Sequence, residues 1–219
     1  MTAPDLADLR LGLHELAAAK VASDPVERVK HRALAAVLIS EGFRRAGLRV
    51  TVVGGAAIEF HAPGAYTTDD LDLVVEGGSD PRSRDELDRI FSALGFAPRG
   101  RHWVAGALFV EVPGRAMDDP AADYSVGGYP LRLARPEVLL ADRVVGFRHW
   151  RYTAYGLQAL AMLAALEDDA LDHRWLEARL RREHAQGAYR ALRELHASGE
   201  AVTEETMQQI LERLDKGSS

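Results

Sequence analysis

Two aspartates separated by one leucine are the residues whose type and spacing most clearly favour chemistry. Asp70 and Asp72 stand at the start of a stretch that continues as the apolar run 73–75. Residues two apart in a β-strand point to the same face, so both carboxylates are expected to project together. Mg²⁺ prefers oxygen ligands and is typically held by one or two carboxylates plus substrate phosphates. The alternative is that both are only polar residues beginning a strand after the turn residues Thr67 and Thr68.

A glutamate inside another apolar stretch is the candidate for a third acid. Glu111 interrupts an otherwise apolar strand predicted at 108–112, and a charge buried there needs a partner such as a metal ion. On a strand adjacent to the aspartates it would complete a two-metal site, in which one ion activates an attacking hydroxyl and the other steadies a pyrophosphate leaving group. The alternative is that Glu111 lies on a solvent-facing edge and simply faces water.

Two consecutive glycines close the strand that precedes the acids. Gly54 and Gly55 follow the mostly β-branched run 50–53 and lead into a short helical stretch at 56–61. Backbone without a side chain approaches a phosphate closely, and the N-terminus of the next helix attracts anions, so a triphosphate is expected to bind there. Taken alone, a glycine pair between a strand and a helix is also what an ordinary tight turn needs.

Composition removes several classes of function. The 219-residue chain has no cysteine, which excludes disulfides, thiolate catalysis and cysteine-ligated zinc. Its formal net charge of -6 argues against a protein whose main work is coating nucleic acid, because that work needs a basic surface. No apolar stretch approaches the ~20 residues of a membrane helix, and residues 1–18 lack the pattern of a secretory signal. We therefore expect a cytoplasmic protein without membrane contact.

Hydrophobic spacing and breaker residues predict the elements that position these groups. Asp24 and Pro25 mark a helix start, Ser83 is a second candidate N-cap, and Gly95 is a helix end. The first part of the chain is predicted to form helices over 6–20, 25–46, 56–61 and 84–94, and strands over 48–53, 71–75, 103–104, 108–112, 124–126 and 129–133.

From residue 136 onward the spacing becomes helical throughout. Helices are predicted over 137–150, 152–166, 172–184, 188–197 and 204–214, followed by a frayed tail. The predicted fold is α+β, with a small mixed β-sheet core flanked by helices and a helical C-terminal half. The core, with its two N-terminal helices, is assigned to 1–135 and the helical region packed on it to 136–219. Because the connection at the boundary is short, one folding unit is expected rather than two independent domains.

The combination of these motifs resembles a known superfamily. Val53-Gly54-Gly55, followed after fourteen residues by Asp70-Leu71-Asp72-Leu73, is similar to the signature of the DNA polymerase β-like nucleotidyltransferases. The segment 66–75 particularly resembles AbiEii-type toxins and related uncharacterised bacterial nucleotidyltransferases. The resemblance covers roughly residues 48–150. It implies a mixed-sheet catalytic core, two Mg²⁺ ions, and transfer of a nucleoside monophosphate from a nucleoside triphosphate to a hydroxyl, a phosphate or an RNA end.

The same resemblance implies a role for each motif residue. The paired acids would be metal ligands, the third acid a metal ligand or general base, and the glycines would contact phosphate. The predicted catalytic and metal-binding residues are Asp70, Asp72 and Glu111, and the predicted nucleotide-binding residues are Gly54, Gly55, Thr68 and Arg143.

The sequence also departs from the pattern of this superfamily. A serine often stands beside the phosphate-contacting glycine, whereas here Ala56 and Ala57 follow, and Tyr66 is nearest to the position where AbiEii-type toxins tend to have an arginine. Those toxins also use a lysine and an aspartate from the C-terminal helices, but the C-terminal lysine here is Lys216, in the tail. Arg143 is the plausible substitute, as a cation in reach of a triphosphate. The alternative is that Arg143 only pairs with a nearby acid or lies along its helix.

Other cationic and aromatic residues allow weaker interpretations. Residues 148–151, Arg-His-Trp-Arg, would hold RNA or a nucleotide base by stacking, or they form a helix end with Trp150 buried and the arginines solvated. Arg143 and His149 have the spacing of HEPN-type RNases, but those domains are all-helical. His61 and His102 have no partners at metal-ligand spacing, and we interpret them as structural or surface residues.

The predicted function is a Mg²⁺-dependent nucleotidyltransferase acting on RNA such as tRNA, a protein or a small molecule. The resemblance extends this hypothesis to the toxin of a toxin–antitoxin pair, with an antitoxin as partner. One alternative is a catalytically inactive module of the same fold that binds a nucleotide or a regulatory partner. A second is a structural protein whose acids are incidental, which predicts that Glu111 lies far from Asp70 and Asp72. The sequence does not predict an oligomeric state.

Overall fold

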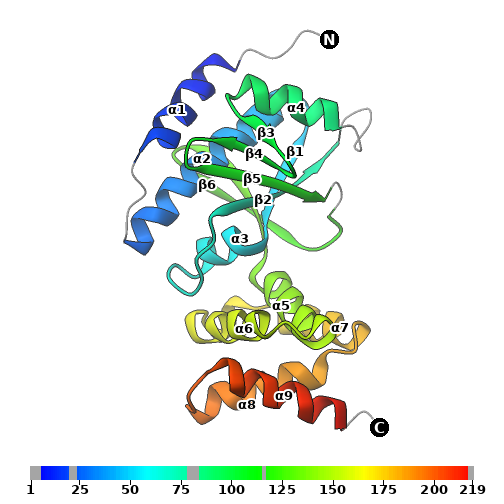
Figure 1. Ribbon diagram of the computed structural model, residues 1–219. Coiled ribbons are helices and arrows are strands. Elements are labelled where there is room, and N and C mark those ends of the chain that lie inside the picture. Colours follow the sequence, from blue (N-terminus) through cyan, green and yellow to red (C-terminus); the bar gives the residue numbers. More distant parts are fainter. Residues whose placement is uncertain (1–5, 20–23, 78–83, 115–116, 217–219) are drawn as a thin grey trace. The chain divides into compact units, whose positions relative to one another are not determined.

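The computed structural model describes residues 6–19, 24–77, 84–114 and 117–216, in a chain that divides into two compact units (Figure 1). The first unit, Met1–Ala134, contains the sheet, and the second, Arg135–Ser219, is helical. The helices of the first unit are α1 (Ala7–Ala18), α2 (Pro25–Arg45), α3 (Gly54–His61) and α4 (Arg84–Ala93). Its strands are β1 (Arg49–Val53), β2 (Asp70–Glu76), β3 (Ala97–Arg99), β4 (His102–Ala105), β5 (Leu108–Gly114), β6 (Ala121–Val126) and β7 (Tyr129–Ala134).

Within the described residues the strands form one seven-stranded mixed sheet, in the order β3-β4-β5-β2-β1-β7-β6. β2 is central, because it pairs antiparallel with β1 on one side and parallel with β5 on the other. β1 also runs parallel to β7, while β4 and β5 form an antiparallel hairpin. These pairings confirm the predicted α+β class with a small mixed sheet flanked by helices.

The side chains of β2 alternate between the apolar core and a partly exposed face of the sheet. Leu71, Leu73 and Val75 are fully or almost fully buried, whereas the residues between them at the start of the strand are partly exposed. The core continues into the helices through stacked aromatic rings. Phe91 of α4 makes an edge contact with Phe43 of α2 and stacks on Trp103 of β4. The acids of β2 therefore stand opposite a close-packed apolar layer that fixes the strand.

Local signals explain where the helices begin. The Asp24 carboxylate accepts a hydrogen bond from the Glu27 amide at 2.9 Å, so the predicted N-cap of α2 is confirmed. Helix α3 begins two residues earlier than predicted, at Gly54 itself. The predicted cap Ser83 and the tail 217–219 lie outside the described residues. Strand β3 was not predicted, because it is three residues long and contains Pro98, which a sheet accepts only on an edge such as this one.

The second unit is a set of helices with its own apolar core. It contains α5 (Pro136–Trp150), α6 (Thr153–Ala165), the short 3₁₀ helix η1 (Asp168–Ala170), α7 (His173–Arg182), α8 (Gln186–Ser198) and α9 (Glu204–Lys216). Side chains from each of its α-helices are fully buried, among them Phe147, Met162, Leu176, Leu192 and Met207. No described helix is both long and apolar enough to cross a membrane.

Candidate active site

The two aspartates occupy alternate positions at the start of β2, as their spacing predicted. Asp70 and Asp72 are both partly exposed, and the residue between them is buried. The Thr68 hydroxyl accepts a hydrogen bond from the Asp70 amide at 3.3 Å, which holds the backbone where the strand begins. The sheet therefore presents both carboxylates on the face turned away from the apolar core.

Glu111 lies directly opposite Asp72 on the neighbouring strand. β5 runs parallel to β2 with Asp72 in register with Glu111 and Asp70 in register with Phe109. Residues in register on adjacent strands point to the same face, so the three acids share one surface of the sheet. The structure thus brings Glu111 together with the aspartates, contrary to the separation expected if the acids were incidental.

Arg101, in the turn between β3 and β4, and His102, the first residue of β4, have side chains that lie among these acids. His102 is in register with Glu111, and its Nε2 lies 3.6 Å from Glu111 Oε2 and 3.7 Å from Asp70 Oδ2. Arg101 places its Nε 3.2 Å from Glu111 Oε2. The interpretation of His102 as a structural or surface residue missed this position. The predicted strand began at residue 103, so it left His102 outside the sheet, whereas in the structure β4 begins at His102 and the hairpin turns at Gly106 and Ala107.

The carboxylates of Asp70 and Glu111 converge on a single point, which His102 Nε2 occupies. That nitrogen is buried and has no hydrogen-bond partner, although both carboxylates lie just beyond hydrogen-bond distance. As the side chains stand, no group of three or more histidine, aspartate or glutamate residues in the described part of the chain is arranged to hold a metal ion. The donor set itself suits Mg²⁺, because it consists of carboxylates that reach a shared point from adjacent strands.

The two glycines permit close packing at the junction of β1 and α3. Gly54 has a φ of +62°, and a Cβ there would lie 2.1 Å from Asp72 Oδ2. A Cβ on Gly55 would lie 2.7 Å from Tyr66 Cε1 and 3.0 Å from Thr68 Cβ. The space that a side chain would fill at each glycine is therefore taken by another part of the protein. These glycines bring the Asp72 carboxylate against the N-terminus of α3, where the helix dipole favours negative charge.

A buried cluster of charges ties α3 and the loop before β2 to α2. The Glu59 side chain is fully buried and binds Arg28 Nε at 2.8 Å, and it also pairs with Arg32 Nη1. Arg28 further donates from Nη2 to the Thr67 hydroxyl at 3.0 Å, and Arg32 lies 3.7 Å from Asp69. Sequence reasoning did not find this cluster, whose signal was a glutamate in the apolar stretch 56–60. It anchors the segment that carries Thr68 into β2.

Arg143 belongs to the helical unit, on α5. Its guanidinium carbon lies 4.9 Å from the centroid of the Tyr155 ring, so the contact shown is with an aromatic face. Its predicted role in nucleotide binding stays a prediction. In the sheet unit, His61 Nε2 lies 2.8 Å from the carbonyl oxygen of Ala134, in keeping with its interpretation as a structural residue.

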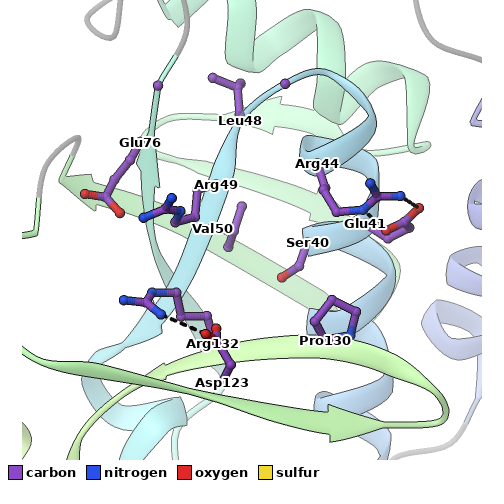
Figure 2. A pocket seen from close by; sticks show the side chains of 12 residues that line it. Ser40, Glu41, Arg44, Leu48, Arg49, Val50, Glu76, Asp123, Pro130 and Arg132 are labelled. Atoms are coloured by element: carbon purple, nitrogen blue, oxygen red, sulfur yellow. Dashed lines mark hydrogen bonds and ion pairs between the residues drawn. The ribbon is translucent and has the colours of Figure 1, made fainter.

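A cavity of about 770 Å³ lies at the other end of β1 and β2 from the acids (Figure 2). Arg49 and Glu76 line this cavity and are opposite each other in the register of β1 and β2. Val53 and Asp72 are opposite each other at the other end of the same two strands. Two ion pairs line it, Arg44–Glu41 and Arg132–Asp123. The described lining residues include none of the predicted functional residues. The cavity is therefore separate from the acid cluster.

Comparisons with known proteins bear on the fold. Neither protein-family models nor curated proteins give a match to the sequence. Among solved structures, the chain is similar to an antigenic nucleotidyltransferase-like protein from Paracoccidioides brasiliensis, with a TM-score of 0.52 and 14% identity, covering 78% of this chain and 95% of that one. The antibiotic-resistance factor ANT(2'')-Ia gives a TM-score of 0.45 and 17% identity over 80% and 99% of the two chains. The first likeness shows that this chain has the fold of a nucleotidyltransferase-like protein.

Proposed function

We propose that this protein is a Mg²⁺-dependent nucleotidyltransferase that moves a nucleoside monophosphate from a nucleoside triphosphate to an acceptor. The observation that carries the proposal is the register of Asp72 with Glu111, with Asp70 two residues away on the same face. The nucleotidyltransferase-like fold is a second support for it.

The three acids would have different roles in the transfer reaction. In the transfer, an acceptor oxygen bonds to the α-phosphorus, the bridging bond to the β-phosphate breaks, and pyrophosphate leaves. Mg²⁺, when bound, would supply positive charge to the attacking and leaving oxygens. Asp70 and Asp72 would hold the metal, and Glu111 would either join them or take the proton of the acceptor hydroxyl.

The side chains of Arg101 and His102 determine what must move before nucleotide and metal bind. Both lie against Oε2 of Glu111, an oxygen that a metal or an acceptor hydroxyl would use. The Arg101 side chain is 72% exposed, so its displacement breaks an ion pair that water already screens. His102 is more enclosed, and its Nε2 would have to leave the point between Asp70 and Glu111 before a metal ion bound by both carboxylates could take that place.

The nucleotide is proposed to bind where β1 meets α3. The N-terminal amides of α3 would face its phosphates, with Gly54 and Gly55 providing backbone and Thr68 providing a hydroxyl. Because Asp72 lies against Gly54, a metal bound by Asp72 would stand next to those phosphates.

The proposal is tested by incubating the protein with α-³²P-labelled nucleoside triphosphates, Mg²⁺ and a cell lysate. We expect label to appear on an RNA, a protein or a small molecule, and its chemical class identifies the acceptor. Asp70→Asn combined with Asp72→Asn should lower labelling by about 100-fold or more, since the metal supplies several kcal/mol of transition-state stabilisation. Asp85→Asn, an exposed carboxylate on α4, is the matched control and should label as the wild type does. Undiminished labelling by the double variant would refute the proposal.

A catalytically inactive nucleotide-binding module is the second candidate. It is favoured by the contacts of Arg101 and His102 with Glu111, which occupy the third acid. This candidate predicts Mg²⁺-dependent binding of a triphosphate in calorimetry without any transfer of label.

The role of a toxin with an antitoxin partner is a further part of the proposal. It predicts growth arrest when the wild-type chain is expressed alone and normal growth with the double aspartate variant. Equal arrest by both chains at equal expression would contradict it.

A further inference from the structure

Three aromatic rings gather where α5 ends and α6 begins, wholly within the helical unit. Trp150 is the last residue of α5, Tyr152 precedes α6, and Tyr155 lies in its first turn. The Tyr155 ring is 5.7 Å from Trp150 and 5.2 Å from Tyr152 between centroids. Trp150 is 71% exposed and Tyr152 is 57% exposed, so the interpretation of Trp150 as a buried residue is wrong. Large exposed apolar rings grouped together typically mark a binding surface.

The surface of α5 is shaped to hold these rings. A Cβ on Gly146 would lie 2.3 Å from Tyr155 Cδ2 and 3.2 Å from Trp150 Cε3, so only glycine allows both rings to lie so close. Arg143, one turn earlier on the same helix face, places its guanidinium over Tyr155. Its Nε is buried and has no hydrogen-bond partner. Arg143, Gly146 and the three rings therefore form one continuous platform.

Two further arginines, Arg148 and Arg151, lie within two residues of Trp150 in the sequence. Arg148 and Arg151 both pair with Asp215 of α9, the former at 3.3 Å, so two positive charges share one carboxylate. Each uses one nitrogen in that contact, whereas a guanidinium has five N–H donors. Arg151 has a φ of +55°, a left-handed conformation that is uncommon for residues other than glycine. The fold thus holds two arginines on one carboxylate, close in sequence to the exposed Trp150 and Tyr152.

We propose that this platform binds single-stranded nucleic acid. Bases would stack on Trp150 and Tyr152, and the backbone phosphates would meet Arg148 and Arg151. Stacking needs exposed ring faces and a phosphate backbone needs cations, and the platform offers both together. A duplex offers neither its base faces nor the same backbone path, so single strands are the preferred ligand. The proposal requires no transfer reaction.

Fluorescence anisotropy with the full chain tests this proposal. The probes are fluorescein-labelled oligo(U) and oligo(dT) of about 12 nucleotides, within the ~4–16 nucleotides that such sites cover, and a duplex of equal length. The wild type should bind the single strands more tightly than the duplex, and comparison of the two single strands shows whether RNA or DNA is preferred. Trp150→Ala and Tyr152→Ala should each weaken binding by about 5- to 150-fold. Tyr129→Ala, an exposed tyrosine of β7, is the matched control and should bind as the wild type does.

The salt dependence of binding tests the arginines separately. Arg151→Ala should lower the slope of log Kd against log salt concentration by about one, because one phosphate contact is lost. Binding unchanged in both aromatic variants, equal binding of the duplex, or no binding by a folded wild type would overturn the proposal. So would self-association that Trp150→Ala abolishes without any nucleic acid present. Loss of transfer in the double aspartate variant with binding retained separates this proposal from the proposed function.

Discussion

Gly54 is the single residue on which the geometry around Asp72 most depends. Its left-handed backbone turns the chain from β1 into α3, and its missing side chain leaves room for the Asp72 carboxylate. An L-residue with a side chain is disfavoured in both respects, because it resists positive φ and would collide with that carboxylate.

Gly54→Ala should therefore destabilise the protein more than an alanine at a left-handed glycine in open space. Gly47 has a φ of +80°, and no described atom lies within 4 Å of the place that a Cβ would take, so Gly47→Ala should cost only the backbone preference, about 1 to 2 kcal/mol. Gly54→Ala should cost about 1 to 3 kcal/mol more, because the side chain of Asp72 must move. Urea unfolding of the two variants measures the difference. Equal losses would show that Asp72 is not held against Gly54.

Glu41 on α2 carries a pH-dependent contribution to stability. The hydrogen bond from Arg44 holds the pKa of the Glu41 carboxyl below its ordinary value of 4.5, against the opposing effect of burial, and Arg45 lowers it further. Because the folded-state pKa is the lower one, this contribution is complete above the unfolded value and is lost as the pH falls through the folded value.

Glu41→Gln should therefore flatten the acid side of the stability profile. We expect the wild type to lose more free energy of unfolding than the variant as the pH falls below about 4.5. Urea unfolding at a series of pH values gives both profiles. Parallel profiles would mean that the Arg44–Glu41 contact adds nothing to the folded state.

At the level of elements, buried ion pairs of Glu59 with two arginines attach α3 to α2. One of these arginines, Arg28, also binds Thr67 in the loop before β2. Glu59 has no exposed side-chain surface, and its two arginine partners are largely enclosed. Glu59→Gln should lower the free energy of unfolding by about 3 to 5 kcal/mol, because it leaves two enclosed cations without their carboxylate. Urea unfolding measures this loss.

A surface ion pair on α2, the helix that also carries the two arginine partners of Glu59, provides the control. Glu27 and Lys30 are 58% and 62% exposed, so Glu27→Gln should cost less than about 1 kcal/mol. A similar loss in both variants would show that the Glu59 cluster contributes no more than a solvated pair.

The elements also show what the sequence could predict and what it could not. The period of two in β2 predicted a face for Asp70 and Asp72, and the structure confirms that strand because alternation is a local property. The position of His102 opposite Glu111 was not predicted, because the predicted strand began at residue 103 and the turn was expected one residue too early to give this register. The pairing of Glu59 with Arg28 was beyond prediction, because it depends on how α2 lies against α3, which no periodicity within either segment specifies.

At the scale of the whole molecule, fold similarity survives where sequence similarity does not. At 14% identity the chain shares a fold with a nucleotidyltransferase-like protein, because burial pattern and strand order tolerate substitution far better than individual residues do. The net charge of the whole chain predicts less about function than the fold does. A net charge of -6 predicted that coating nucleic acid is not the main function. It does not report local charge, such as that of Arg148 and Arg151, which share the single carboxylate of Asp215.

Calorimetric titration of the protein with each nucleoside triphosphate, with and without Mg²⁺, tests the central claim most directly. That claim is that Asp70, Asp72 and Glu111 form one metal-dependent nucleotide site. The predicted result is binding that requires Mg²⁺, is lost when Asp70 and Asp72 are both replaced by Asn, and is retained in Asp85→Asn. Binding that is equal with and without Mg²⁺, or that survives in the double aspartate variant, would contradict the account.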